Sequence, residues 1–114
     1  MHLVAQLLDN ARSDTNLLRK NDAAGDDFSV PRDIDFLLVA SDETKANLVR
    51  DFVNDNRYGV ANVQAHDGGF GVLVVVHMAP QQDVLCSVSA LMVCIGKLFD
   101  IEYDGWGCVL QVSA

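Results

Sequence analysis

Three carboxylates alternate with other residues near the carboxyl end of the chain, at Asp100, Glu102 and Asp104. Alternate side chains of an extended segment share one face, so three such groups could together bind Mg²⁺ or Ca²⁺. The segment lacks the glycine-turned loop and the further ligands that a calcium site uses. It also offers no apolar pocket for one carboxyl, which a glycosidase acid pair requires. We therefore expect solvated carboxylates at the start of a strand, and no metal.

Tyr103 and Trp106 lie among these acids, beside Gly105 and Gly107. Glycine lets the backbone bend, or approach a neighbour closely, where a side chain would obstruct it. Because Trp usually packs, composition alone predicts a helix-to-strand connection in which Trp106 closes the end of the core. The alternative is a surface on which the aromatic rings anchor a partner and the acids form ion pairs at its rim.

The nonapeptide at 99–107, Phe-Asp-Ile-Glu-Tyr-Asp-Gly-Trp-Gly, resembles the closing signature of the regulator of ribonuclease activity B family. Members of this family are bacterial protein inhibitors of the endoribonuclease RNase E. A second match lies upstream, where a Gly-Asp loop at 25–27 precedes a Pro-Arg pair that opens the segment at 31–36. The order of elements fits from about Leu17 to Val112. Many members carry a long acidic tail, whereas this sequence stops at Ala114, so no role of that tail is carried over.

The composition fits a single acidic globular domain. The chain has 114 residues, half of them hydrophobic, which is enough for a core without metals or disulfides. Its net charge is -8, and an acidic surface repels phosphate backbones, so we expect no direct nucleic-acid binding. Such a surface suits a basic partner, including an enzyme that acts on nucleic acids. Solubility alone is the alternative explanation.

The cysteines and the amino terminus point to the cytoplasm. Cys86, Cys94 and Cys108 are odd in number, have no CxxC spacing and lie in apolar surroundings, which predicts free, buried thiols in a reducing compartment. No basic segment precedes the short apolar patch at 3–8, and Gln6 interrupts that patch, so we expect no signal peptide. No run approaches the roughly 20 apolar residues of a membrane span.

We divide the chain into an N-terminal helical segment and loop at 1–27 and a ferredoxin-like part at 28–114, within a single domain overall. Apolar residues recur at helical spacing from Leu3 and predict one helix, interrupted near Ser13 and ending before Asn21. Turn residues then predict a loop up to Asp27.

Apolar periodicity predicts four strands, at 34–40, 60–66, 70–78 and from about 103 to 112. The run from Val72 to Val76 is uninterrupted, so we expect the third strand to be covered on both faces. Asp67-Gly68-Gly69 is typical of a tight hairpin whose two glycines take positive φ.

Two helices lie between these strands. The hydroxyl of Ser41 is expected to cap the first, and the second is expected to open at Pro80. The order is β-α-β-β-α-β, an α+β ferredoxin-like sandwich with an additional N-terminal helix. Right-handed crossovers predict the strand order 4-1-3-2 with both main helices on one face, and with Val74 and Leu91 buried.

The remaining reactive side chains form no catalytic set. His66 and His77 lie about one hairpin apart, close enough to approach across the ladder, but neither has a third ligand or a nucleophile beside it. The glycines at 68–71 precede a strand rather than a helix, so they do not form a phosphate cradle. The serines have no adjacent base. We predict that the chain is not an enzyme and carries no cofactor.

The resemblance implies a protein that binds an RNase E-type ribonuclease and lowers its activity. Alternatives are a small-molecule-binding ferredoxin-like module and an immunity-type inhibitor of another nuclease or toxin. The sequence leaves the oligomeric state open, and it leaves Arg32 two roles, in a partner interface or in an internal pair with the acidic stretch. The candidate partner-binding residues are Asp100, Glu102, Tyr103, Asp104 and Trp106, with Arg32 and Asp35 in support.

Overall fold

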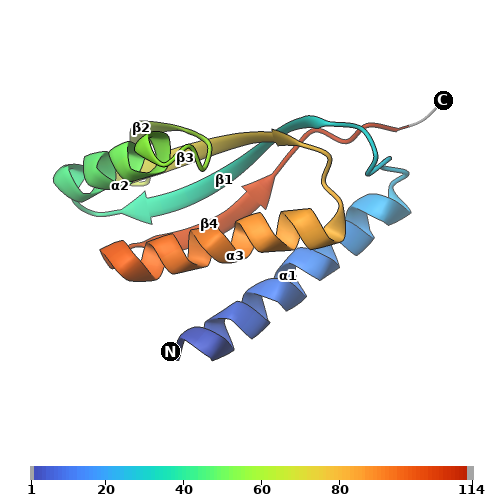
Figure 1. The fold of residues 1–114 in the computed structure, drawn as a ribbon, viewed down its shortest axis with the longest axis horizontal. Coiled ribbons are helices and arrows are strands. Elements are labelled where there is room, and N and C mark those ends of the chain that lie inside the picture. The colour runs from blue at the N-terminus through green and yellow to red at the C-terminus, as the bar shows by residue number, and fades with distance from the viewer. Residues whose placement is uncertain (1, 113–114) are drawn as a thin grey trace.

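The computed structural model describes residues 2–112 and contains three helices and four strands (Figure 1). In chain order they are α1 (Leu3–Ala23), β1 (Arg32–Ala40), α2 (Glu43–Asp55), β2 (Val60–His66), β3 (Gly69–Met78), α3 (Gln82–Phe99) and β4 (Glu102–Gly107).

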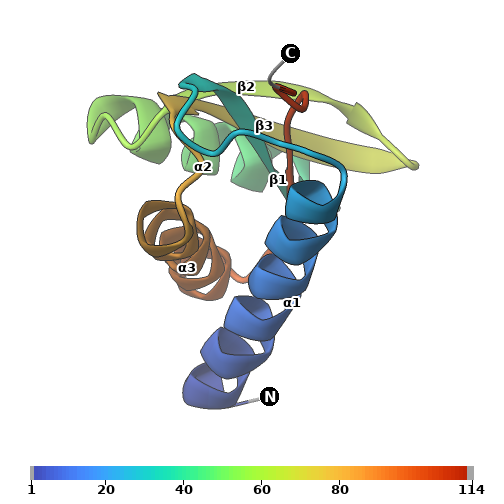
Figure 2. The ribbon, with the colours of Figure 1, turned by 90° about the vertical axis from the view of Figure 1, so that its right-hand side faces the viewer.

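The strands form one antiparallel sheet in the order β2-β3-β1-β4, so the two most apolar strands are central, as the topology predicts. All three helices lie on one side of the sheet (Figure 2). The α+β, ferredoxin-like fold with an additional N-terminal helix is thereby confirmed.

The core lies between the sheet and the helices α2 and α3. On β1, alternate residues point inward because the side chains of a strand repeat every two residues, and Ile34, Phe36 and Leu38 are fully buried. Val74 of β3 is buried as predicted. Leu91 of α3 is only half-buried, so that prediction is wrong. Its position on the helix turns it partly away from the sheet.

The other face of the sheet carries no helix in the part of the chain that the structure describes. Leu37 and Val39 of β1 lie on this face beside Leu73 and Val75 of β3, and all four are half-buried. The prediction that β3 is covered on both faces is therefore wrong. Valine suits a half-exposed pleated surface as well as a buried one, so an unbroken valine run does not distinguish them.

Several helix boundaries differ from those predicted. Helix α1 is continuous through Ser13 and extends to Ala23, because helix formers such as Leu17 and Arg19 follow the serine. The cap of α2 is Asp42 rather than Ser41, since the Asp42 side chain accepts from the Thr44 N–H.

Helix α3 begins at Gln82, with the buried Pro80 two positions before it. In the hairpin, Asp67 and Gly68 take positive φ, whereas Gly69 already belongs to β3. Aspartate tolerates this conformation better than most residues. Strand β4 ends at Gly107, well before the predicted limit at Val112, which forms only an isolated bridge to Asp26.

Candidate functional site: an acidic groove between helix α1 and strand β4

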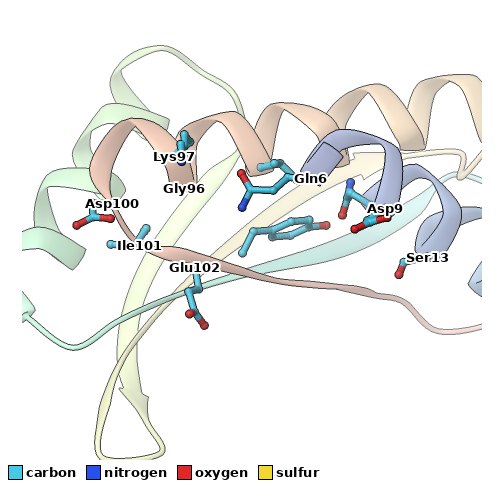
Figure 3. A pocket seen from close by; sticks show the side chains of 11 residues that line it. Gln6, Asp9, Ser13, Gly96, Lys97, Asp100, Ile101 and Glu102 are labelled. Carbon is cyan, nitrogen blue, oxygen red and sulfur yellow. The ribbon is translucent and has the colours of Figure 1, made fainter. Parts of the chain in front are cut away.

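Helix α1 packs mainly on α3 and leaves a groove along β4. The larger of its two hollows measures about 490 Å³ and lies between the first half of α1, the end of α3 and the start of β4. A neighbouring hollow of about 380 Å³ continues along α1 toward Asp104 and Trp106. Figure 3 shows the larger hollow, with Gln6 and Asp9 on α1.

Carboxylates dominate the rim of this groove. Asp9, Asp100 and Glu102 line the larger hollow, and Lys97 is the only cationic side chain among its described lining residues. Asp104 lines the smaller hollow. The whole therefore presents negative charge to a ligand.

The three carboxylates of the nonapeptide do not converge. Asp100 is not on the strand: it ends α3 in the left-handed conformation, with φ 56°. Glu102 lies opposite Val39 on β1 and points away from α1 (Figure 3). Within residues 2–112, no group of three or more His, Cys, Asp or Glu side chains could hold a metal ion.

A bulge in β4 brings Tyr103 and Trp106 to one face. Tyr103 lies opposite Leu38 and Trp106 lies opposite Phe36. Between these two pairs β4 advances by three residues, whereas β1 advances by two. Without the extra residue, Tyr103 and Trp106 would point to opposite faces. Gly105 absorbs the distortion with φ +99°. The bulge at Gly105 thus turns both aromatic rings toward α1 and α3.

Both aromatic side chains are half-buried and end in hydrogen bonds. The Tyr103 hydroxyl lies 2.9 Å from Ser89 Oγ on α3, and the Trp106 Nε1 donates to Asp14 Oδ1 on α1 at 3.0 Å. Asn10 completes the network, donating to Asp14 Oδ2 at 3.2 Å and to Ser89 Oγ at 3.0 Å. Burial raises the pKa of the Tyr103 hydroxyl; the hydrogen bond with Ser89 opposes this rise, and the Asp14 carboxylate adds to it.

Sequence analysis missed Asp14, Ser89 and Asn10. Asp14 is only 3% exposed and Ser89 is fully buried. Burial raises the pKa of Asp14, and the hydrogen bonds from Ser89 and Trp106 oppose that rise. The available signal was position: Asn10 and Asp14 continue the helical stripe that begins with Leu3 and Leu7. A polar residue in such a stripe needs a buried partner.

Arg32 is buried in the loop structure rather than exposed at the groove. Its Nη1 lies 2.7 Å from Asp26 Oδ1, and its Nη2 donates to the carbonyl of Asp27 at 2.6 Å. Of the two roles left open, the internal one is observed, although the partner is Asp26 and not the acidic stretch. Asp26 Oδ1 also accepts from the Gln111 N–H, so this pair fastens the segment after β4.

The remaining candidates lie elsewhere. Asp35 is exposed on the helix-free face of the sheet, opposite Val75. His66 lies opposite Gly69 at the start of β3, whereas His77 lies near the end of β3, so the two histidines do not approach each other. His77 Nδ1 lies 2.9 Å from Asp33 Oδ1.

The three cysteines are free thiols, as expected, but they are not all buried. Cys94 is exposed, because it lies on the outer side of α3, and Cys86 and Cys108 are half-buried. Burial raises the pKa of both half-buried thiols.

Fold and groove together define a ferredoxin-like α+β protein with an acidic surface hollow, in which the closing nonapeptide forms one wall and part of the floor. The chain belongs to the regulator of ribonuclease activity B family, whose family model matches residues 11–108. The resemblance seen in the nonapeptide is thereby confirmed, and the family is one of ribonuclease regulators. A search of the curated proteins found no match.

Proposed function

We propose that the chain regulates an RNase E-type endoribonuclease by binding it and lowering its activity, without catalysis of its own. The acidic groove between α1 and β4 is the proposed binding site, and a basic segment of the ribonuclease is its ligand. The proposal rests chiefly on one observation: Asp9, Asp100 and Glu102 border the same hollow, although the Glu102 carboxylate points away from α1, and Lys97 is the only basic residue among the described lining residues.

A second feature of the wall favours a ligand rich in hydrogen-bond donors. The side-chain oxygen of Gln6 is buried and accepts no hydrogen bond from the described residues. A buried acceptor without a donor is costly, and Arg and Lys supply donors only. A basic side chain placed in the groove would pair with the neighbouring carboxylates, and it would meet this oxygen once the Gln6 side chain turned toward the groove.

The alternative of a small-molecule module is less well supported. The volume of the larger hollow suits a ligand of that size, but such sites are usually lined by apolar side chains with a few polar groups. Here carboxylates, amides and two hydroxyl groups dominate the lining. We place the protein in the cytoplasm, where its thiols stay reduced and where a ribonuclease partner acts on RNA.

A matched pair of triple variants tests the proposal. The first neutralises the groove with Asp9→Asn, Glu102→Gln and Asp104→Asn. The second removes the same charge from exposed positions outside it, with Asp22→Asn, Glu43→Gln and Asp55→Asn. Binding to the purified ribonuclease is measured by calorimetry, and inhibition by cleavage of an RNA substrate.

We expect the groove variant to bind ~10-fold more weakly or worse, which corresponds to about 1.4 kcal/mol. The control should stay within about threefold of the wild type, which is less than 1 kcal/mol. Equal losses in the two variants would mean that net charge, and not the groove, carries the interaction. Tight binding by the groove variant would remove this site from the interface.

A further inference from the structure

The outer side of α3 carries a stripe of five residues, alternately three and four positions apart. Val84 and Leu98 are 42% and 67% exposed, Cys94 and Ser87 are exposed, and Leu91 is half-buried. This spacing is the heptad pattern by which two helices pack side by side. We call Val84, Ser87, Leu91, Cys94 and Leu98 the α3 stripe.

The other two sides of α3 are already occupied. Leu85, Met92 and Ile95 point into the core beneath the sheet. Ser89 faces α1 through Asn10, and Gln82 reaches Thr15 at 3.4 Å. In Figure 2, α1 stands beside α3 and the sheet lies above both.

An apolar side of a helix is normally buried against another part of the protein. Helix α3 is long and apolar enough to cross a membrane by length and composition alone, yet only 28% of it is buried. Within the described residues Val84, Ser87, Cys94 and Leu98 are exposed, and only Leu91 is partly covered, by the core. An exposed apolar surface of this kind marks an interaction site.

We propose that the α3 stripe is the interface of a homodimer in which two α3 helices pack antiparallel. In this arrangement Val84 packs against the partner's Cys94, and Ser87 against the partner's Leu91. The proposal does not depend on any ribonuclease, because none of the five stripe residues lines the groove, although Lys97 borders both surfaces.

Charges beside the stripe select a second copy and its direction. Asp83 and Lys97 are exposed and immediately precede Val84 and Leu98, which places them on the same flank of the stripe. Antiparallel pairing brings Asp83 close to the partner's Lys97. The two-fold symmetry of the dimer forms the same ion pair a second time, at the other end of the interface. Parallel pairing would instead leave Asp83 fourteen residues, about 21 Å along the helix, from the partner's Lys97, so this ion pair would not form.

Other occupants fit the surface less well. The five stripe residues carry no charge, so the stripe itself offers nothing to a strongly basic helix. Self-association buries the least charged side of α3 against an identical surface.

Sedimentation velocity of the purified chain, from low-micromolar to millimolar concentration, measures the proposed equilibrium. Val84→Glu should raise the dimer dissociation constant ~10-fold or more, because it places a charge opposite the partner's Cys94 in the seam. Leu8→Glu is the matched control: Leu8 is 62% exposed on α1, outside the stripe, and its substitution should leave the constant unchanged. Circular dichroism checks that both variants fold.

A monomer at every concentration would overturn the proposal, as would a Val84→Glu protein that dimerises like the wild type. Sedimentation of the monomer with anionic phospholipid vesicles would also overturn it and assign the stripe to a lipid surface.

A charge exchange tests the orientation. Lys97→Glu and Asp83→Lys should each weaken the dimer, since each places like charges opposite one another. The double exchange should restore association. Two weak single variants and an equally weak double variant would contradict antiparallel pairing.

Thiol crosslinking supplies a second measure of the orientation. With diamide as the oxidant, Val84→Cys should form a disulfide between the new thiol and the partner's Cys94. Wild-type Cys94 should not reach the partner's Cys94, because ten residues of offset separate them by about 15 Å along the helix. Mass spectrometry identifies the bonded peptides. A bond between the two copies of Cys94 in the wild type would show parallel pairing and overturn the arrangement.

Discussion

The indole Nε1 of Trp106 donates to Oδ1 of Asp14 across 3.0 Å, and these two residues are 92 positions apart in the chain. The bond ties the edge strand β4 to the additional helix α1. Trp106 thus helps to hold together the two walls of the groove. A change at Trp106 will affect folding as well as binding, so the two effects must be measured separately.

Trp106→Phe keeps an aromatic ring but removes the donor to Asp14. The buried carboxylate then lacks one of its partners, and we expect a loss of ~1–3 kcal/mol in the free energy of unfolding. Trp106→Ala also leaves unfilled space and should cost more. Urea denaturation followed by circular dichroism measures both. Unchanged stability in Trp106→Phe would show that the hydrogen bond contributes nothing.

Asp14→Asn should change how stability depends on pH. Because the pKa of Asp14 is raised in the folded protein, the folded state binds the proton more readily than the unfolded state. Wild-type stability relative to Asp14→Asn should therefore increase as pH falls through the raised pKa. The increase should be complete below the ordinary value of 3.8. Denaturation of both proteins across this range measures the difference; a constant difference would contradict the assignment.

Arg32→Met should be strongly destabilising. It leaves Asp26 as a buried charge without its ion-pair partner, which typically costs ~3–5 kcal/mol. Arg12→Met is the matched control, because Arg12 is 76% exposed and lies 3.8 Å from Asp9. That surface pair should contribute less than ~1 kcal/mol. Chemical denaturation compares them, and similar losses would mean that the buried pair has no special role.

Gly105→Ala should destabilise the bulge of β4, whereas Gly107→Ala should not. A Cβ added at either position meets no atom within 4 Å, but only Gly105 has a positive φ, +99°. The difference therefore isolates backbone strain, which we expect to be ~1–2 kcal/mol. Thermal unfolding measures it. Equal melting temperatures would show that the bulge readily adjusts.

Binding to the ribonuclease should weaken as salt increases. The Debye length is already near ~8 Å at physiological ionic strength and shortens further above it. The slope of log affinity against log salt should be shallower for the groove variant, because fewer ion pairs remain to be screened. A wild-type affinity independent of salt would mean that the acidic surface is incidental.

Periodicity located every strand and helix because each element is either buried on one face or alternates regularly. It failed where a single residue decides the geometry. The bulge at Gly105 changes which side chains of β4 share a face. Asp100 was misplaced because it ends α3 in the left-handed conformation and does not belong to the strand. The burial of Leu91 and of the β3 valines was predicted wrongly for another reason. The apolar character of a side chain does not reveal whether neighbouring residues cover that side chain.

The groove itself was only half visible in the sequence. The nonapeptide supplied one wall and the aromatic floor, but the opposite wall comes from residues near position 10. Nothing in local spacing indicates that Asp14 lies beside Trp106, since that contact depends on how α1 docks. Arg32 and Asp26 illustrate the same limit, because their ion pair depends on the path of the loop between them.

Helix α1 buries only two side chains, Asp14 and Leu18, although it is 21 residues long. Its amides should therefore exchange with solvent through local opening, well below the free energy at which β1 and β3 open. When helix α1 opens locally, the groove loses one of its two walls. A ligand that contacts both walls must then hold the helix in place, and it will slow amide exchange along α1 while the central strands keep their own rate.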